Sequence, residues 1–122
     1  MKESVHQAAI FRWSRDENVR KRFPELALLH HIKNEEKGGA RSVAIDRAMG
    51  VKPGVPDICL PVPRNGKHGL YIELKSEGGR ISAAQDWWGE RLQDQGYAWY
   101  VAHGAQEAVD IISRYLIGRD KV

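Results

Sequence analysis

Residues 54–75, with the sequence GVPDICLPVPRNGKHGLYIELK, decide the fold of this chain. Two stretches, 57–61 and 70–75, read as strands, and Asn65–Gly66 between them is a pair typical of tight β-hairpin turns. The segment is therefore predicted to form two antiparallel strands. Asp57 and Glu73 are equally far from Asn65, so a turn centred on Asn65 places these two residues directly opposite each other.

Three residues of this predicted hairpin suggest chemistry: Asp57, Glu73 and Lys75. Side chains alternate along a strand, so Glu73 and Lys75 share one face while Leu74 points to the other. Opposed residues have Cβ atoms about 4.5–5.5 Å apart, where two carboxylates repel unless a proton or cation lies between them. Mg²⁺ prefers oxygen ligands, so the two carboxylates and the Leu74 carbonyl form a candidate metal site. Lys75 could then hold a water or neutralise a phosphate, although an isolated E-x-K is usually an ordinary exposed strand pair.

The rest of the chain predicts helices and strands around this hairpin. Helices are expected over 3–15, 42–48, 82–95 and 105–117, and further strands over 26–32 and 97–102. Two of the helices have an expected inner stripe: Val5, Ala8, Ala9 and Phe11 in the first, and Ala108, Ile111, Ile112 and Tyr115 in the last. A hairpin combined with a crossover helix predicts an α/β fold with a central mixed sheet flanked by helices.

Composition limits the class of protein. The 122 residues fit one domain, and 42% hydrophobic with 29% charged residues allow a real core, which excludes wholesale disorder. No apolar run approaches the roughly 20 residues that span a bilayer, and no secretory signal is expected. A single cysteine, Cys59, excludes an intramolecular disulfide and favours the cytoplasm. The net charge of +3 lies mainly in the first half and permits a polyanionic partner such as nucleic acid.

Further motifs accompany the hairpin along nearly the whole chain. They are ESVHQ at 3–7, Asn34, KGGARS at 37–42, MGVKPGVPD at 49–57, IELK at 72–75, SAAQ at 82–85 and a closing aromatic strand. P-D and E-x-K alone are short and common, whereas the ordered set at these spacings is much more specific. The set resembles the VRR-NUC (virus-type replication-repair nuclease) family of the PD-(D/E)XK nuclease superfamily, in its stand-alone form.

The resemblance implies a single nuclease domain over 1–122 with a restriction-endonuclease-like fold, a Mg²⁺ or Mn²⁺ ion, and hydrolysis of phosphodiester bonds in structured DNA. By matching position, Asp57 and Glu73 bind the metal and Lys75 is the catalytic lysine. Glu3 is a further acidic residue that faces the site, and Gln85 orients Lys75, the water or a phosphate. Glu3 could also belong to a solvated helix face, and Gln85 could simply close a capping box with Ser82.

Four residues are expected to contact DNA: Gln7, Asn34, Lys37 and Arg41. Contacts to phosphates supply affinity without reading sequence, which suits a structure-selective enzyme. The alternatives are a turn at Asn34 and a merely solubilising basic surface. Trp87 and Trp88 are adjacent and cannot share one narrow helix stripe. One is expected in the core, and the other in the core, on a base-stacking surface or, by preference, at a dimer contact.

The sequence thus predicts a metal-dependent endodeoxyribonuclease, acting as a dimer on branched DNA and above all on a four-way (Holliday) junction. A two-fold dimer presents two equivalent sites, which matches the paired cuts that a junction needs. Its expected location is the cytoplasm, or the host cytoplasm for a viral source. Three alternatives remain open: a nuclease for flaps, splayed arms or single-stranded DNA, a DNA-binding module with a silent site, and a structural accessory protein.

Overall fold

A mixed sheet forms the centre of the computed structural model, which describes residues 1–33 and 40–118. Within these residues the strands are β1 (His30–His31), β2 (Ile58–Leu60), β3 (Leu70–Lys75) and β4 (Ala98–His103), in that order across the sheet. β2 pairs antiparallel with both β1 and β3, whereas β3 pairs parallel with β4. This arrangement is the predicted α/β fold with a mixed sheet.

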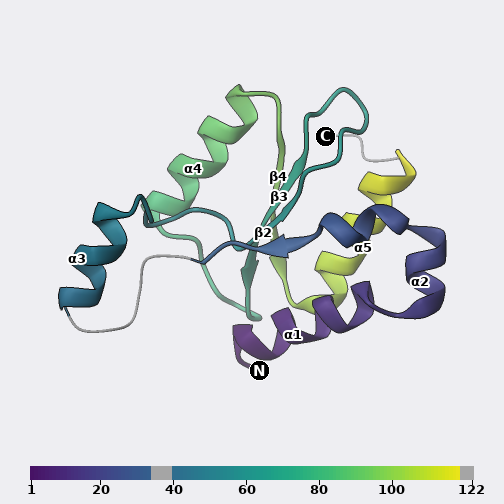
Figure 1. Cartoon of the computed structure of the whole chain (residues 1–122), viewed down its shortest axis with the longest axis horizontal. Helices are drawn as coiled ribbons and strands as arrows, with labels where there is room; N and C mark the ends of the chain where they lie inside the picture. Colours follow the sequence, from purple (N-terminus) through teal and green to yellow (C-terminus); the bar gives the residue numbers. More distant parts are fainter. Residues whose placement is uncertain (34–39, 119–122) are drawn as a thin grey trace.

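Helices lie on both sides of this sheet (Figure 1). They are α1 (Glu3–Ser14), α2 (Glu17–Arg22), a 3-10 helix (Pro24–Leu28), α3 (Ala40–Ala48), α4 (Ala83–Asp94) and α5 (Ala105–Ile117). α5 packs on β3 and β4 and contacts α1, so these two helices cover one face together. α4 packs on β4 from the opposite side, and α3 stands at the far left of the view, away from the sheet. None of the described helices is both long and apolar enough to cross a membrane.

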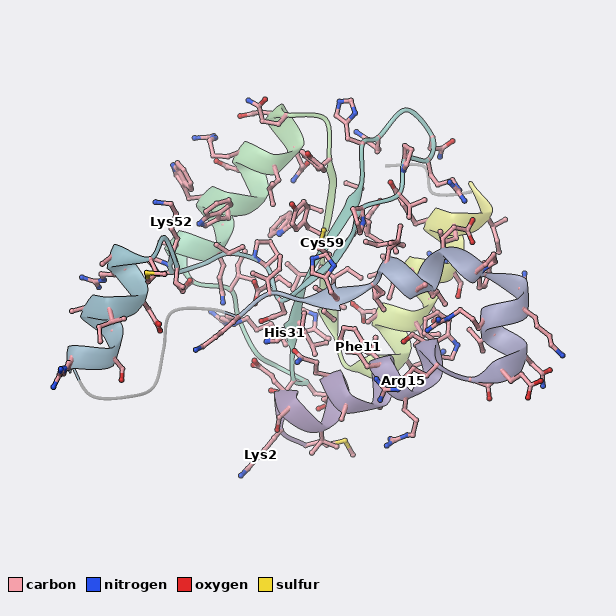
Figure 2. All side chains as sticks on the ribbon, in the orientation of Figure 1. Lys2, Phe11, Arg15, His31, Lys52 and Cys59 are labelled. Carbon is pink, nitrogen blue, oxygen red and sulfur yellow. The ribbon has the colours of Figure 1, made fainter. Side chains whose placement is uncertain are left out.

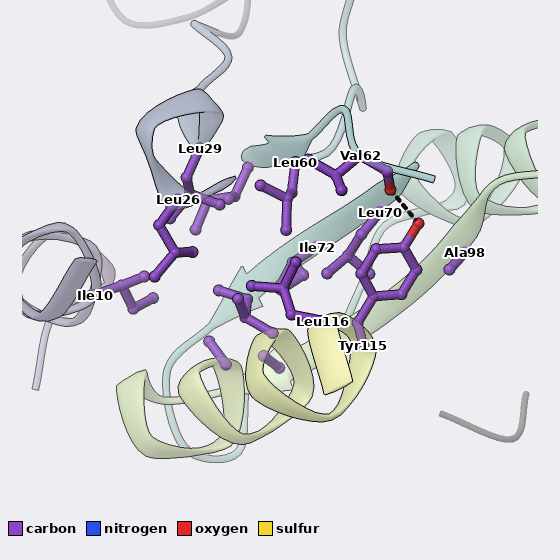
Figure 3. Packing of buried hydrophobic residues seen from close by; sticks show 14 of the residues in the cluster. Ile10, Leu26, Leu29, Leu60, Val62, Leu70, Ile72, Ala98, Tyr115 and Leu116 are labelled. Atoms are coloured by element: carbon purple, nitrogen blue, oxygen red, sulfur yellow. Dashed lines mark hydrogen bonds between the residues drawn. The ribbon is translucent and has the colours of Figure 1, made fainter. Parts of the chain in front are cut away.

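The hydrophobic core lies between the sheet and the α1–α5 layer. Alternate residues of β3, among them Ile72 and Leu74, point into it and meet Ile112 and Tyr115 of α5. The buried Tyr115 hydroxyl donates a 2.6 Å hydrogen bond to the Val62 carbonyl, so this polar group costs the core little (Figure 3). The opposite face of β3 is thereby left for Glu73 and Lys75.

The predicted hairpin register is confirmed. Ile58 pairs with Ile72 and Leu60 with Leu70, which centres the connection on Asn65. Asn65 and Gly66 have φ of 54° and 78°, and the flanking residues 64 and 67 form a bridge. Positive φ at both central positions is the geometry that an Asn-Gly turn supplies. β2 is shorter than the predicted range 57–61, since Asp57 lies just before it and Pro61 just after it.

Predictions for the helices are partly confirmed. The ranges 82–95 and 105–117 correspond to α4 and α5, but the third helix begins at Ala40, so Ser42 lies inside it and does not cap it. The strand expected over 26–32 is wrong for its first half, because Pro24 starts a 3-10 helix that runs to Leu28. Ile111 of α5 is only half-buried, while Leu116 joins the core.

The inner stripe predicted for α1 is wrong at Val5 and Ala8, which are exposed, although Phe11 packs against the core. The buried residues of α1 are His6, Ile10 and Ser14, whereas Val5 is 48% exposed. The Ser14 hydroxyl bonds the Phe11 carbonyl, and the His6 ring accepts a hydrogen bond from the backbone of α5. Because the Ser14 hydroxyl and Nδ1 of His6 each have a hydrogen-bond partner, these side chains can be buried where hydrophobicity predicts apolar ones.

Candidate active site

The buried carboxyl group of Glu73 is the centre of the candidate site. Glu73 lies on the face of β3 opposite the core and is 2% exposed. Lys75 lies two residues further along the same face, half-buried at the end of the strand. A carboxyl group that is buried this deeply must either have hydrogen-bond or charge partners or take up a proton. The surroundings of Glu73 therefore determine what the site can do.

Asp57 is fixed beside Glu73 by hydrogen bonds from two strands. Its Oδ2 atom accepts a 2.8 Å hydrogen bond from the Leu74 backbone N–H, which lies just past the paired part of β2 and β3. Its backbone carbonyl accepts one from the Ile32 N–H and one from Nδ1 of His31, each at 2.8 Å. A carbonyl oxygen only accepts, so Nδ1 of His31 carries the hydrogen.

Gln85 reaches the same site from the start of α4. Its Nε2 atom donates a 3.1 Å hydrogen bond to Oε2 of Glu73. Its Oε1 atom accepts from the Ser82 N–H at 2.8 Å, and the Ser82 hydroxyl accepts from the Gln85 N–H at 3.1 Å. The capping box and the contact with the site are thus made by the same side chain. The helix cap holds the amide in the orientation that Glu73 uses.

The electrostatics of the site favour a neutral Glu73 when no cation is present. Burial, followed by the negative charge of Asp57, raises the pKa of Glu73 from 4.5 to about 9. The charge of Glu3 acts in the same direction, and the charge of Lys75 opposes it. The positive charge of Lys75 therefore lowers the pKa of Glu73 by less than burial and the charge of Asp57 raise it.

A hard divalent cation fits this arrangement. Oε1 of Glu73 is buried and has no hydrogen-bond partner among the described residues, so one carboxylate oxygen is left for a ligand. No cluster of three or more His, Cys, Asp or Glu side chains in residues 1–33 and 40–118 could hold a metal. Side chains would therefore contribute Asp57 and Glu73, with the backbone and water completing the coordination. This division is common for Mg²⁺, which keeps several waters.

The other predicted site residues lie at different distances from this centre. Glu3, at the start of α1, is exposed yet influences the charge of Glu73, which places it at the edge of the site. Gln7 is half-buried one turn further along α1. Arg41 is exposed on α3, away from the sheet, so the structure does not bring it to the carboxylates. Asn34 and Lys37 lie outside the described residues.

His6 is a contact residue that sequence reasoning missed. Its Nδ1 atom accepts a 3.0 Å hydrogen bond from the Ala105 N–H at the first residue of α5, and Nε2 lies 3.4 Å from Oε1 of Glu77. The ring thus caps α5 from α1, across 99 residues of sequence. No spacing or motif signals such a contact, because it depends on how the two helices pack. His31, bonded to the Asp57 carbonyl, was missed for the same reason.

The paired tryptophans differ from expectation because neither is buried. Trp87 is 53% exposed and Trp88 is half-buried, and their rings meet edge to face with centroids 5.8 Å apart. The buried residues of α4 are Gly89 and Leu92 instead. Cys59 forms no disulfide, as predicted, and is buried near the middle of the side-chain view (Figure 2).

Comparisons with known proteins agree with this geometry. The family model of the VRR-NUC domain matches residues 1–106. A solved structure described as a VRR_NUC domain protein is 30% identical, covers 96% of this chain and 89% of its own, and superposes with a TM-score of 0.77. No curated protein matches the chain. The mixed sheet flanked by helices is thus a restriction-endonuclease-like fold, and the chain belongs to the VRR-NUC family of PD-(D/E)XK-type nucleases.

Proposed function

We propose that this protein is a Mg²⁺- or Mn²⁺-dependent endodeoxyribonuclease that cuts branched DNA, with four-way junctions as its preferred substrate. The observation that carries the proposal is the buried Glu73 carboxyl beside Asp57, on the strand face that also bears Lys75. Ionisable groups with strongly perturbed pKa values gather at functional sites. A module that only binds DNA has no need for a buried acidic pair that destabilises the fold.

Each residue of the site has a role that follows from its contacts. Asp57 and Glu73 would hold the ion, with the Leu74 carbonyl as a third ligand, and Gln85 holds Oε2 of Glu73, which leaves Oε1 without a hydrogen-bond partner among the described residues. The ion, when bound, supplies Lewis-acid polarisation of the phosphate and a lower pKa for an attacking water. Lys75 offsets the negative charge that develops on the phosphate as the bond to the leaving oxygen breaks. Glu3 keeps the edge of the site acidic.

Basic residues on the same molecule support binding to a phosphate backbone. Arg15, Arg20 and Lys21 line an open hollow of about 530 Å³ where α1 meets α2, together with one acid, Glu17. Arg15 points outward at the end of α1 (Figure 2). Such contacts add affinity for any DNA and leave discrimination to the shape of the substrate. Gln7, Asn34, Lys37 and Arg41 are proposed to add further DNA contacts.

A two-fold dimer would provide the two equivalent sites that symmetric cleavage of a junction requires. The half-exposed Trp87 supports an interface on α4, because aromatic side chains are enriched where proteins associate. A reducing, cytoplasmic setting is consistent with the free Cys59. Light scattering of the purified chain, with and without DNA, measures the oligomeric state directly.

The substrate and the metal are tested together in one cleavage experiment. The protein is incubated with a labelled four-way junction, a flap, a splayed arm, a single strand and a duplex, each with Mg²⁺, Mn²⁺ or EDTA. Paired symmetric nicks in the junction, lost in EDTA, are expected. Cutting of the flap or single strand instead would replace the substrate and keep the chemistry. DNA binding without cutting in any metal would make a silent binding module the correct description.

The catalytic assignment is tested with matched lysine variants. Lys75→Ala is expected to abolish cleavage while leaving folding and DNA binding nearly unchanged, and Asp57→Ala is expected to do the same. Lys67→Ala is the control, because Lys67 lies on the same hairpin but at the turn, beyond the far ends of the paired strands. Full cutting by Lys75→Ala in Mg²⁺ would overturn the assignment.

A further inference from the structure

Helix α4 presents two neighbouring rows of residues to two different parts of the candidate site. Ala84 and Trp88 are four residues apart and form one row, and Gln85 and Gly89 form the next. The first row faces the segment that leads into β2, and the second faces the sheet. One rigid helix therefore contacts both the segment that precedes Asp57 and the side chain of Glu73.

The first row contacts the segment just before Asp57. The Trp88 indole N–H donates a 3.1 Å hydrogen bond to the Pro53 carbonyl. Gly54, with φ of +87°, lies so close to α4 that an added Cβ would come within 2.7 Å of the Ala84 carbonyl carbon. From Gly54 the chain reaches Asp57 in three residues. These contacts set where that short segment starts.

The second row attaches the same helix to the sheet. An added Cβ at Gly89 would lie 2.4 Å from the Trp99 ring, so α4 packs on β4 at a distance that only glycine allows. One turn earlier, Gln85 holds Glu73. The position of α4 on the sheet is thus fixed independently of its contact with residues 53–54.

The segment before Asp57 needs such a support because the strand ladder does not extend to it. β2 pairs with β3 only from Ile58 to Leu60, and Asp57 lies outside the paired residues. The bonds to its side chain from Leu74 and to its carbonyl from Ile32 and His31 hold Asp57 itself, but they do not fix the path of the preceding chain. The contacts of α4 with Pro53 and Gly54 supply that missing restraint.

We propose that Trp88 is a positioning residue: its hydrogen bond to Pro53, together with the Gly54–Ala84 contact, lets α4 set the distance between Asp57 and Glu73. The inference rests on the proposed function, since it takes these two carboxylates as the metal ligands. Partners that orient metal ligands typically change metal affinity by about 10–100-fold when they are removed. Trp88 acts through the backbone, so the lower end of that range, about 10-fold, is expected.

The test compares two tryptophans that are neighbours in sequence. Trp88→Phe keeps an aromatic ring but removes the N–H that bonds Pro53 along with the pyrrole part of the indole, and Trp87→Phe makes the same chemical change at the exposed neighbour. Mn²⁺ binding to the full chain, without DNA, is measured by the electron paramagnetic resonance signal of free Mn²⁺. We expect the Kd for Mn²⁺ to rise about 10-fold in Trp88→Phe and to stay within about 2-fold in Trp87→Phe.

A second pair of variants keeps the test decisive if Trp88→Phe fails to fold. Gly54→Ala and Gly50→Ala both place a side chain at positive φ, +87° and +92°, but only the Cβ at residue 54 meets Ala84. A larger loss of Mn²⁺ affinity in Gly54→Ala than in Gly50→Ala is expected. Unfolding in urea, measured for all four variants, separates a general loss of stability from a loss of metal binding.

The outcomes distinguish this inference from the proposed function. If the native chain does not bind Mn²⁺, the metal site itself is wrong. If the native chain binds Mn²⁺ and Trp88→Phe binds it with the native Kd, the positioning role is wrong, even where urea unfolding shows lower stability. Weaker binding by Trp88→Phe and Gly54→Ala, with near-native unfolding midpoints and unaffected controls, supports the role.

Discussion

Replacing Glu73 by Gln is expected to stabilise the metal-free protein while abolishing its metal binding. The pKa of Glu73 rises from 4.5 to about 9 on folding, because the carboxyl is buried beside Asp57. Between these two values the folded state holds a proton that the unfolded state has lost. Stability therefore falls as pH rises from 4.5 towards 9, which is the opposite of the usual behaviour of a salt-bridged acid.

The size of the effect follows from the same values. Each pH unit within this window costs about 1.4 kcal/mol, so at pH 7 the native side chain reduces stability by about 3 kcal/mol. Gln is uncharged in both states, and its amide oxygen still accepts the hydrogen bond from Nε2 of Gln85. Glu73→Gln removes the pH-dependent cost. For a chain of this length, about 3 kcal/mol corresponds to a rise in Tm of about 10 °C.

Urea unfolding in EDTA at pH 5 and at pH 8 measures this directly. The stability difference between Glu73→Gln and the native protein should be under about 1 kcal/mol at pH 5 and grow by about 4 kcal/mol at pH 8. Glu17→Gln serves as the control, because its side chain is 84% exposed and should show no such growth. A difference for Glu73→Gln that is the same at both pH values would refute the reasoning.

Three further substitutions test the packing around the site. Tyr115→Phe leaves the buried Val62 carbonyl without its donor and should cost about 1–3 kcal/mol in urea unfolding; an unchanged midpoint would contradict this. Ser82→Ala removes the cap of α4, so it should lower the free energy of unfolding by about 1 kcal/mol and weaken Mn²⁺ binding. A loss of stability with unchanged Mn²⁺ binding would show that the cap does not act on the site. His6→Phe leaves the Ala105 N–H without its acceptor, so the amides of the first turn of α5 should exchange hydrogen faster, and native exchange rates would argue against the cap.

The sequence was sufficient to predict the centre of the fold because the hairpin is local. The equal spacing of the two strands from Asn65 predicts the register that pairs Ile58 with Ile72, and Asn65–Gly66 supplies the positive φ values of the turn. Alternation along β3 then places Glu73 and Lys75 on one face without any knowledge of the rest of the chain. The Ser82–Gln85 cap is equally local, since both partners lie within one turn of α4.

Contacts between distant segments were not predictable in the same way. The burial of His6 on α1 contradicts the hydrophobic pattern, because its Nδ1 atom is bonded by the Ala105 N–H, a partner 99 residues away that sequence does not reveal. The failure at 26–32 has a different cause. Leu26 and Leu29 are buried as an apolar run should be, but Pro24 directs that run into a 3-10 helix.

Gln85 shows how local and distant information combine at this site. Its place in a capping box follows from the sequence, and so does the orientation of its amide relative to α4. Its contact with Glu73 depends instead on where α4 lies on the sheet, which the close approach of Gly89 to Trp99 determines. A bulkier residue at 89 would move the helix outward and carry the Gln85 amide away from Glu73, although the cap itself would survive. The site is therefore specified by a pair of residues, Gly89 and Trp99, that carry none of its chemistry.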